Sequence, residues 1–232
     1  MSIHPEYWLS LDLSSPVGSL SIHERLGQEN PRLLLSKIIT TSGDHSERFV
    51  PALQEGLITT GISPKSFSKF VTSSGPGSFT GLRIAFASLK ALAYNNLTPI
   101  EVLSGSEARA LHWVRTQKLK NYKKIHVITY ITVERFVSAD FEIGSDGRLN
   151  LVSESSFNDW SFLEAHPTVA VLLDSRAHQI HSSQFKNNSI FCTDLTAELL
   201  GEALLSAQTR KTCTTIQEWI ELSPNYFGST RY

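Results

Sequence analysis

The sequence contains few cysteines and no excess of charge of either sign. Cys192 and Cys213 are its only two cysteines, too few for a disulfide framework or a thiolate metal site. Among the 232 residues, 21 lysines and arginines are balanced by 22 aspartates and glutamates. The resulting net charge of −1 excludes a strongly basic protein that coats nucleic acid.

Long apolar runs, internal repeats and low-complexity segments are missing as well. No stretch approaches the roughly 18 uninterrupted apolar residues that a membrane helix needs. The first residues, MSIHPEYWLSLDLSS, lack a basic segment followed by an apolar run, so we expect no signal peptide. These absences lead us to expect a soluble cytoplasmic protein without membrane contact.

The composition is that of a globular protein, and strand and helix patterns alternate in the first half. Strand patterns occur within residues 7–23, 33–41, 67–72 and 99–102. Apolar residues at helical spacing predict helices over residues 46–60 and 78–94. This order favours an α/β layered lobe over residues 1–105.

The second half, residues 106–232, is predicted to form a smaller second lobe. Its strand patterns cover residues 125–131, 135–143 and 169–173, and a helix is predicted over 194–209. In this prediction the C-terminal helix can pack back on the first lobe. The expected molecule therefore has two lobes of α/β structure.

The most informative segment is a glycine-rich stretch before the second predicted helix. Residues 74–81 read SGPGSFTG, and glycines permit backbone angles that other residues avoid. The helix start that follows suits a phosphate or carboxylate, so Gly75, Gly77 and Ser78 are candidate phosphate contacts. The stretch matches neither G-x-G-x-x-G nor G-x-x-x-x-G-K-[ST]. Tight packing of strand on helix, without any ligand, is an equally good interpretation.

A second polar turn follows the first predicted strand. Asp12, Ser14 and Ser15 could hold a hydrated Mg²⁺ and the phosphates that it bridges. Alternatively, these short side chains satisfy the amides of their own turn. Taken alone, the turn favours the second interpretation.

The sequence predicts neither a metal site nor a catalytic centre. His45 could be imagined as a metal ligand, but the position four residues later on the same helix is Phe49. No nucleophile motif accompanies the eight scattered histidines. The segment 109–124 carries six basic residues and no acidic one, which is more often a solvated face than a contact to RNA.

The glycine-rich stretch also carries a family resemblance. Residues 75–84, GPGSFTGLRI, resemble the signature of the TsaB (YeaZ) family, the accessory subunits of bacterial tRNA threonylcarbamoyladenosine (t6A) synthesis. Residues 11–15, 45–47, 90–93 and 224–226 fit the same family in order. The second lobe departs from it, because Thr129-Tyr130-Ile131 stands where the family usually has aspartate-alanine-arginine.

The resemblance implies a two-lobed fold of the actin, sugar-kinase and Hsp70 type. It implies a non-catalytic partner of a TsaD-type transferase, which modifies adenosine 37 of tRNA, together with a TsaE-type ATPase in the larger assembly. By the same resemblance we expect a heterodimer with the transferase, a homodimer when alone, and contact with tRNA through the complex. We expect no tightly bound cofactor, and ATP or ADP with Mg²⁺ only at the assembled complex.

The resemblance also implies where the partner binds. In the family, the two first-lobe helices pack against their counterparts in TsaD or in a second copy. The residues expected at this interface are His45, Phe49, Leu53, Arg83, Phe86 and Lys90. The alternative is that the apolar ones belong to the core of the chain itself, which periodicity does not decide.

An enzymatic alternative stays open at this point. The chain could be a stand-alone ATP-dependent phosphotransferase of the same superfold, with Asp12 organising Mg²⁺. Against it, no second phosphate loop is recognisable in residues 106–232. The segment 169–175, VAVLLDS, is a plausible strand before such a loop, but Arg176 follows it instead of glycines.

Overall fold

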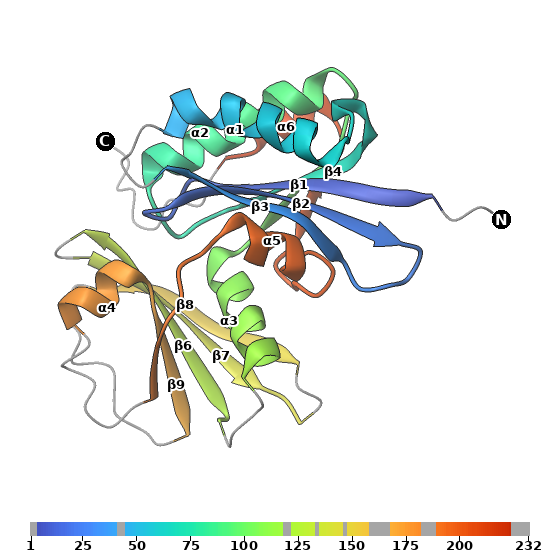
Figure 1. The fold of residues 1–232 in the computed structure, drawn as a ribbon. Coiled ribbons are helices and arrows are strands. Elements are labelled where there is room, and N and C mark those ends of the chain that lie inside the picture. Colours follow the sequence, from blue (N-terminus) through green and yellow to red (C-terminus); the bar gives the residue numbers. More distant parts are fainter. Residues whose placement is uncertain are drawn as a thin grey trace.

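A computed structural model gives the fold of the chain. It describes residues 4–40, 45–117, 122–132, 135–145, 148–157, 168–181 and 189–223. Two lobes, each built on one β-sheet, lie one above the other with helices between them (Figure 1). The predicted two-lobed α/β architecture is confirmed.

The first sheet has six strands in the order β11-β5-β4-β1-β2-β3. These strands are β1 (Pro5–Asp12), β2 (Gly18–Leu26), β3 (Arg32–Thr40), β4 (Phe67–Ser73), β5 (Ile100–Leu103) and β11 (Lys211–Cys213). The first three are antiparallel neighbours, whereas β4 pairs parallel with both β1 and β5. The strands of the first half therefore form the sheet that their patterns predict, and β11 joins it from far along the chain.

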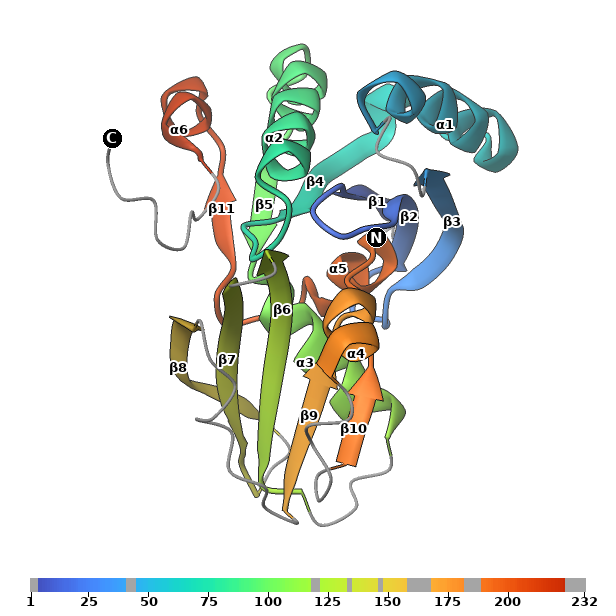
Figure 2. The ribbon, with the colours of Figure 1, turned by 90° about the vertical axis from the view of Figure 1, so that its left-hand side faces the viewer.

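Three helices cover one face of this sheet, and Figures 1 and 2 show them side by side. They are α1 (His45–Thr60), α2 (Phe79–Tyr94) and α6 (Ile216–Glu221). A short 3-10 turn, η1 (Pro64–Ser66), leads from α1 to β4. The apolar sides of the helices and the strands share one core, because the burial of both faces removes apolar area from water.

The sequence explains the bounds of α2 better than those of α1. Ser78 caps α2, since its Oγ accepts a hydrogen bond from the Gly81 N–H at 3.2 Å. Helix α1 contains Pro51 near its first turns, although a proline removes one backbone donor inside a helix. Both helices lie within two residues of their predicted ranges.

The second sheet has five strands in the order β10-β9-β6-β7-β8. These strands are β6 (Lys124–Thr132), β7 (Arg135–Ile143), β8 (Leu149–Phe157), β9 (Val169–Leu173) and β10 (Ser189–Cys192). Helix α3 (Gly105–Thr116) packs on one face and α4 (Ser175–His181) on the other. Alternation along β6 serves both cores, because Val127 lies in the cluster of α3 and Ile128 in that of α4.

The chain returns to the first lobe after the second sheet. Helix α5 (Ala197–Ala203) lies between the lobes and packs on β1 and β2, opposite to α1 and α2 (Figure 1). The predicted helix over 194–209 is therefore shorter than its pattern suggested. Trp219 of α6 is buried in the core of the first sheet, and its Nε1–H donates to the Cys213 carbonyl at 3.0 Å. Residues 197–221 thus contribute to the first lobe as well.

Candidate functional site

The polar turn after β1 satisfies itself. Asp12 is buried, and its Oδ1 accepts hydrogen bonds from the Ser14 N–H at 3.1 Å and from the Ser14 Oγ–H at 2.6 Å. Its Oδ2 lies 2.6 Å from the Ser15 Oγ. Burial raises the pKa of Asp12, and the serine hydrogen bonds partly offset this rise. The carboxylate thus serves the turn, as the second interpretation of this segment expected.

The glycine-rich stretch packs directly on this turn. The Ser78 N–H donates to the Ser14 carbonyl at 2.7 Å. At Gly77, a Cβ atom would lie 2.7 Å from the Ser14 Cβ and backbone oxygen. Gly75 has a φ of 104°, and its carbonyl accepts from the Gly105 N–H at 2.9 Å. Close backbone approach explains these glycines without a ligand.

Four of the six predicted phosphate contacts, Ser14, Ser15, Gly77 and Ser78, nevertheless meet at one cavity, which Gly75 does not line. A cleft of about 640 Å³ opens between the lobes. Its first-lobe wall includes Ser14, Ser15 and residues 76–81, and its second-lobe wall includes residues 129–132. Asp12 does not line this cleft, because its carboxylate lies within the turn. The sequence motifs therefore lie on one wall of the cleft, and the fold supplies the other wall.

A buried arginine that sequence analysis placed in a basic surface run stands at this cleft. Arg109 of α3 lines the cleft and is only 2% exposed. Its guanidinium donates to the Ile128 carbonyl at 3.2 Å, to the Thr129 Oγ1 at 2.9 Å and to the Leu172 carbonyl at 3.4 Å. Burial lowers its pKa, and the nearby Asp174 opposes that shift. Arg109 is therefore a fixed internal cation, not part of an exposed run.

Asp174 completes the second-lobe wall. It follows β9, and its Oδ2 accepts from the Tyr130 N–H at 2.6 Å while its Oδ1 accepts from the Ala177 N–H at 2.8 Å. Burial raises the pKa of this carboxyl, and Arg109 lowers it. The acid therefore ties β6 to the start of α4. In the sequence, Asp174 is recognisable only as an acidic residue that directly follows a predicted buried strand. Its contacts with β6 and α4 are visible only in the structure.

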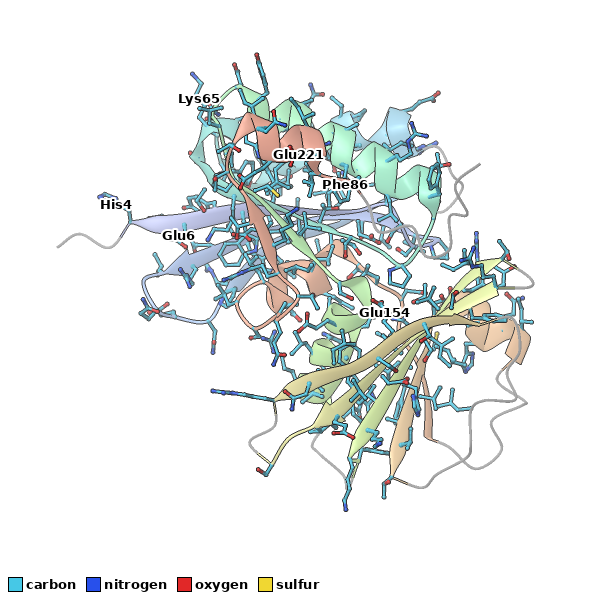
Figure 3. All side chains as sticks on the ribbon, turned by 180° about the vertical axis from the view of Figure 1, so that it is seen from behind. His4, Glu6, Lys65, Phe86, Glu154 and Glu221 are labelled. Atoms are coloured by element: carbon cyan, nitrogen blue, oxygen red, sulfur yellow. The ribbon has the colours of Figure 1, made fainter. Side chains whose placement is uncertain are left out.

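The predicted partner residues divide into two groups. Phe49 and Phe86 are each only 4% exposed and lie in the core of the first sheet, where Figure 3 places Phe86 on α2. Leu53 is buried in the same core and only borders a surface groove. All three side chains thus pack in this chain's own core, which favours the alternative interpretation, and their role in a partner contact stays a prediction.

The other predicted partner residues lie nearer the surface. Arg83 is exposed, and its guanidinium carbon lies 5.3 Å from the ring centre of Phe79. Lys90 is half-buried, and its Nζ donates to the Leu222 carbonyl at 2.8 Å, which ties α2 to the end of α6. The side chain of His45 and residues 224–226 lie outside the described part of the chain.

The outer side of α1 and α2 carries the exposed apolar residues that sequence analysis missed. Ile58 is 83% exposed and Tyr94 is 66% exposed. Leu57 of α1 and Ala91 of α2, together with residues of η1 and β4, line a groove of about 280 Å³. The apolar periodicity of each helix identifies the side that faces the sheet. It gives no information about apolar residues on the outer side.

Metal-ligating side chains are not clustered in the part of the chain that the structure describes. Among the described residues, no group of three or more histidines, cysteines, aspartates and glutamates could hold a metal ion. In the same residues, no helix has both the length and the apolar character to cross a membrane. Of the six basic residues in 109–124, Arg109 is buried, Arg115 bonds to the Glu202 carbonyl, and Lys118 and Lys120 lie outside the described segments.

Comparisons with known proteins point to one family. Residues 39–119 match the family described as "TsaD: tRNA N6-adenosine threonylcarbamoyltransferase". The "tRNA threonylcarbamoyladenosine biosynthesis protein TsaB" of Bacillus subtilis (strain 168) is 39% identical over 67 residues. That match spans 29% of this chain and 29% of the relative, so it covers less than a third of either protein.

Two solved structures share the fold over most of the chain. One is an uncharacterized Pseudomonas aeruginosa protein described as similar to peptidase YEAZ, with a TM-score of 0.73, 18% identity, and coverage of 96% of this chain and 100% of that one. The other is YeaZ from Pseudomonas aeruginosa, with a TM-score of 0.67, 18% identity, and coverage of 85% and 89%. The fold is thus the two-lobed actin, sugar-kinase and Hsp70 type. This chain is therefore similar to a TsaB protein over one segment of its sequence and shares its fold with YeaZ structures over most of its length.

Proposed function

We propose that this chain is a non-catalytic partner of a TsaD-type transferase in the synthesis of threonylcarbamoyladenosine at position 37 of tRNA. The observation that carries the proposal is the exposed apolar surface of α1 and α2, with the groove that both helices line. The match to the TsaB protein named for t6A biosynthesis supports the same pathway.

The chemistry of the surface fits another helix pair. Ile58 of α1 and Tyr94 of α2 are exposed, and the groove is lined mostly by apolar side chains. Ala87 and Ala91 are exposed one turn apart on α2, and such small side chains let a second helix approach closely. Apolar anchors in a groove typically contribute most of the binding energy of an interface.

The cleft gives little support to a stand-alone phosphotransferase. In that mechanism Asp12 would hold Mg²⁺ together with the nucleotide phosphates. Here both of its carboxylate oxygens are engaged by Ser14 and Ser15, and Gly77 packs against the same turn. A nucleotide and Mg²⁺ therefore belong, in this proposal, to the assembled complex and not to this chain alone.

Complex formation tests the proposal. The chain is mixed with the TsaD-type transferase from the same source, and the mass of the complex is measured by size-exclusion chromatography with light scattering. We expect a one-to-one complex, which Ile58→Asp and Tyr94→Asp abolish. Val152→Asp is the matched control, because Val152 is an exposed apolar residue of β8 in the second lobe.

Two results would contradict the proposal. The first is the absence of a complex at concentrations well above micromolar with ATP and Mg²⁺ present. The second is tight Mg-ATP binding by the isolated chain that Asp12→Ala removes, which would favour the phosphotransferase. The same chromatography shows whether the chain alone is a homodimer, and the addition of a TsaE-type ATPase tests the larger assembly.

A further inference from the structure

The cleft between the lobes is not used by the helix surface proposed to bind the transferase. Its volume of about 640 Å³ lies within the range of sites that hold small ligands or parts of larger ones. Hydroxyl groups line much of it, including those of Ser14, Ser15, Ser78 and Thr129. Such a cavity needs its own explanation.

The charges at the cleft favour an anion. Arg109 and Arg176 line it, and Asp174 is the one acidic residue among the described lining residues. Both oxygens of Asp174 accept backbone hydrogen bonds, whereas the buried Nε of Arg109 has no partner in the described part of the chain. Arg176 is exposed. The positive end of α2 adds to this field.

An aromatic ring stands at the same cleft. Phe79, the first residue of α2, lines the cleft and is 51% exposed. Arg83, one turn later, lies over its ring at 5.3 Å. An exposed aromatic ring beside arginines is the arrangement on which unpaired bases of RNA stack, while cations contact the phosphates.

The carboxylates near the cleft indicate which kind of anion it binds. At nucleoside triphosphate sites Mg²⁺ is usually bound by one or two carboxylates in addition to the phosphates, and Asp12 and Asp174 are both engaged with the protein itself. A phosphodiester carries a single charge and needs no metal. We propose that the cleft binds an unpaired nucleotide of RNA, with its base against Phe79 and its phosphate beside Arg176; this rests on the proposed role in tRNA modification.

The test uses the full chain and a fluorescently labelled single-stranded heptaribonucleotide, with binding followed by anisotropy at several salt concentrations. Phe79→Ala weakens binding by about tenfold, because it removes the stacking surface. Arg176→Ala weakens it and reduces the slope of log affinity against log salt by about 0.7, as for the loss of one phosphate contact. Phe79→Trp retains binding.

Lys211→Ala is the matched control, since Lys211 is an exposed cation of β11 and does not line the cleft. Circular dichroism checks that each variant is folded. No binding by the unaltered chain, or equal losses in Lys211→Ala, overturns the inference. A third outcome would assign the cleft to a free nucleotide instead: Mg-ADP binds and the RNA does not, and Phe79→Ala weakens the binding of Mg-ADP. Because no transferase is present, a negative result here leaves the complex-formation proposal standing.

Discussion

Gly81 in the first turn of α2 lies against the carbonyl of Leu13. A Cβ atom on Gly81 would stand 1.7 Å from the Leu13 oxygen and 2.6 Å from its carbonyl carbon. Backbone is thus packed on backbone, and the helix start can approach the turn after β1 only because position 81 has no side chain. This contact fixes the first-lobe wall of the cleft.

Gly81→Ala should therefore cost more than about 3 kcal/mol of unfolding free energy, because neither backbone can move without breaking the turn. Gly56→Ala is the matched control in α1. Its Cβ would lie 2.7 Å from a Leu35 methyl, the movable end of a side chain, and alanine favours the helix by about 1 kcal/mol. Urea unfolding measures both, and similar costs would contradict the backbone contact.

His23 makes stability depend on pH below neutrality. Its ring stacks on Trp8 with centres 5.7 Å apart, and neither ring nitrogen has a hydrogen-bond partner among described residues. Burial lowers its pKa to about 4, against a partial opposing effect of Glu202. The unfolded chain, with a histidine pKa near 6.5, therefore binds the proton more readily.

Stability should then fall as the pH falls from about 6.5 to about 4, by up to about 3 kcal/mol. The measurement is the free energy of urea unfolding at a series of pH values. His23→Gln removes the titration, so this variant should show a flatter profile over that window. An unchanged slope would mean that other groups cause the dependence.

Glu154 acts in the opposite direction. Figure 3 shows this residue on β8, and burial raises its pKa to about 7. The folded chain therefore keeps the proton longer than the unfolded one, and stability falls as the pH rises from about 4.5 through 7. Because the side chain is partly exposed, we expect about 1–2 kcal/mol. Glu154→Gln should be more stable than the unaltered chain at pH 8 and equal to it near pH 4.

Glu107 holds the returning chain against α3. Its Oε1 accepts from the Gln208 N–H at 2.6 Å, and its Oε2 accepts from the Thr209 N–H at 2.9 Å. In Glu107→Gln the side-chain NH₂ group would face one of these backbone N–H groups, so one hydrogen bond is lost. The free energy of unfolding in urea should therefore fall by about 2–3 kcal/mol. Glu221→Gln, at an exposed site on α6, should stay within about 0.5 kcal/mol. A cost below 1 kcal/mol at Glu107 would contradict this role.

Local sequence patterns predicted correctly those helices and strands that depend on residues close together along the chain. The apolar spacing of α1 and α2 and the strands of the first sheet follow from periodicity, because each buries one side. Helix α3 was not predicted, although Ser104 caps it and Glu107 lies in its first turn. Its burial depends on packing against both sheets, and most of their strands lie far from α3 in the sequence.

The candidate site shows the same division. Periodicity marks Phe49 and Phe86 as one-sided, but only the sheet decides that this side is the core and that Ile58 and Tyr94 face outward. Likewise, Arg109 reads as one cation in a basic run until β6 and β9 surround it.

By itself, the sequence determined the lobe type, the glycine-rich start of α2 and the family resemblance, because these depend on residues close together along the chain. Tertiary structure decided which apolar residues remain exposed, that Asp12 serves its own turn, and that Arg109, Asp174 and Phe79 meet at one cleft. The physical reason is that burial and electrostatic environment are set by segments distant in sequence, which no local pattern contains.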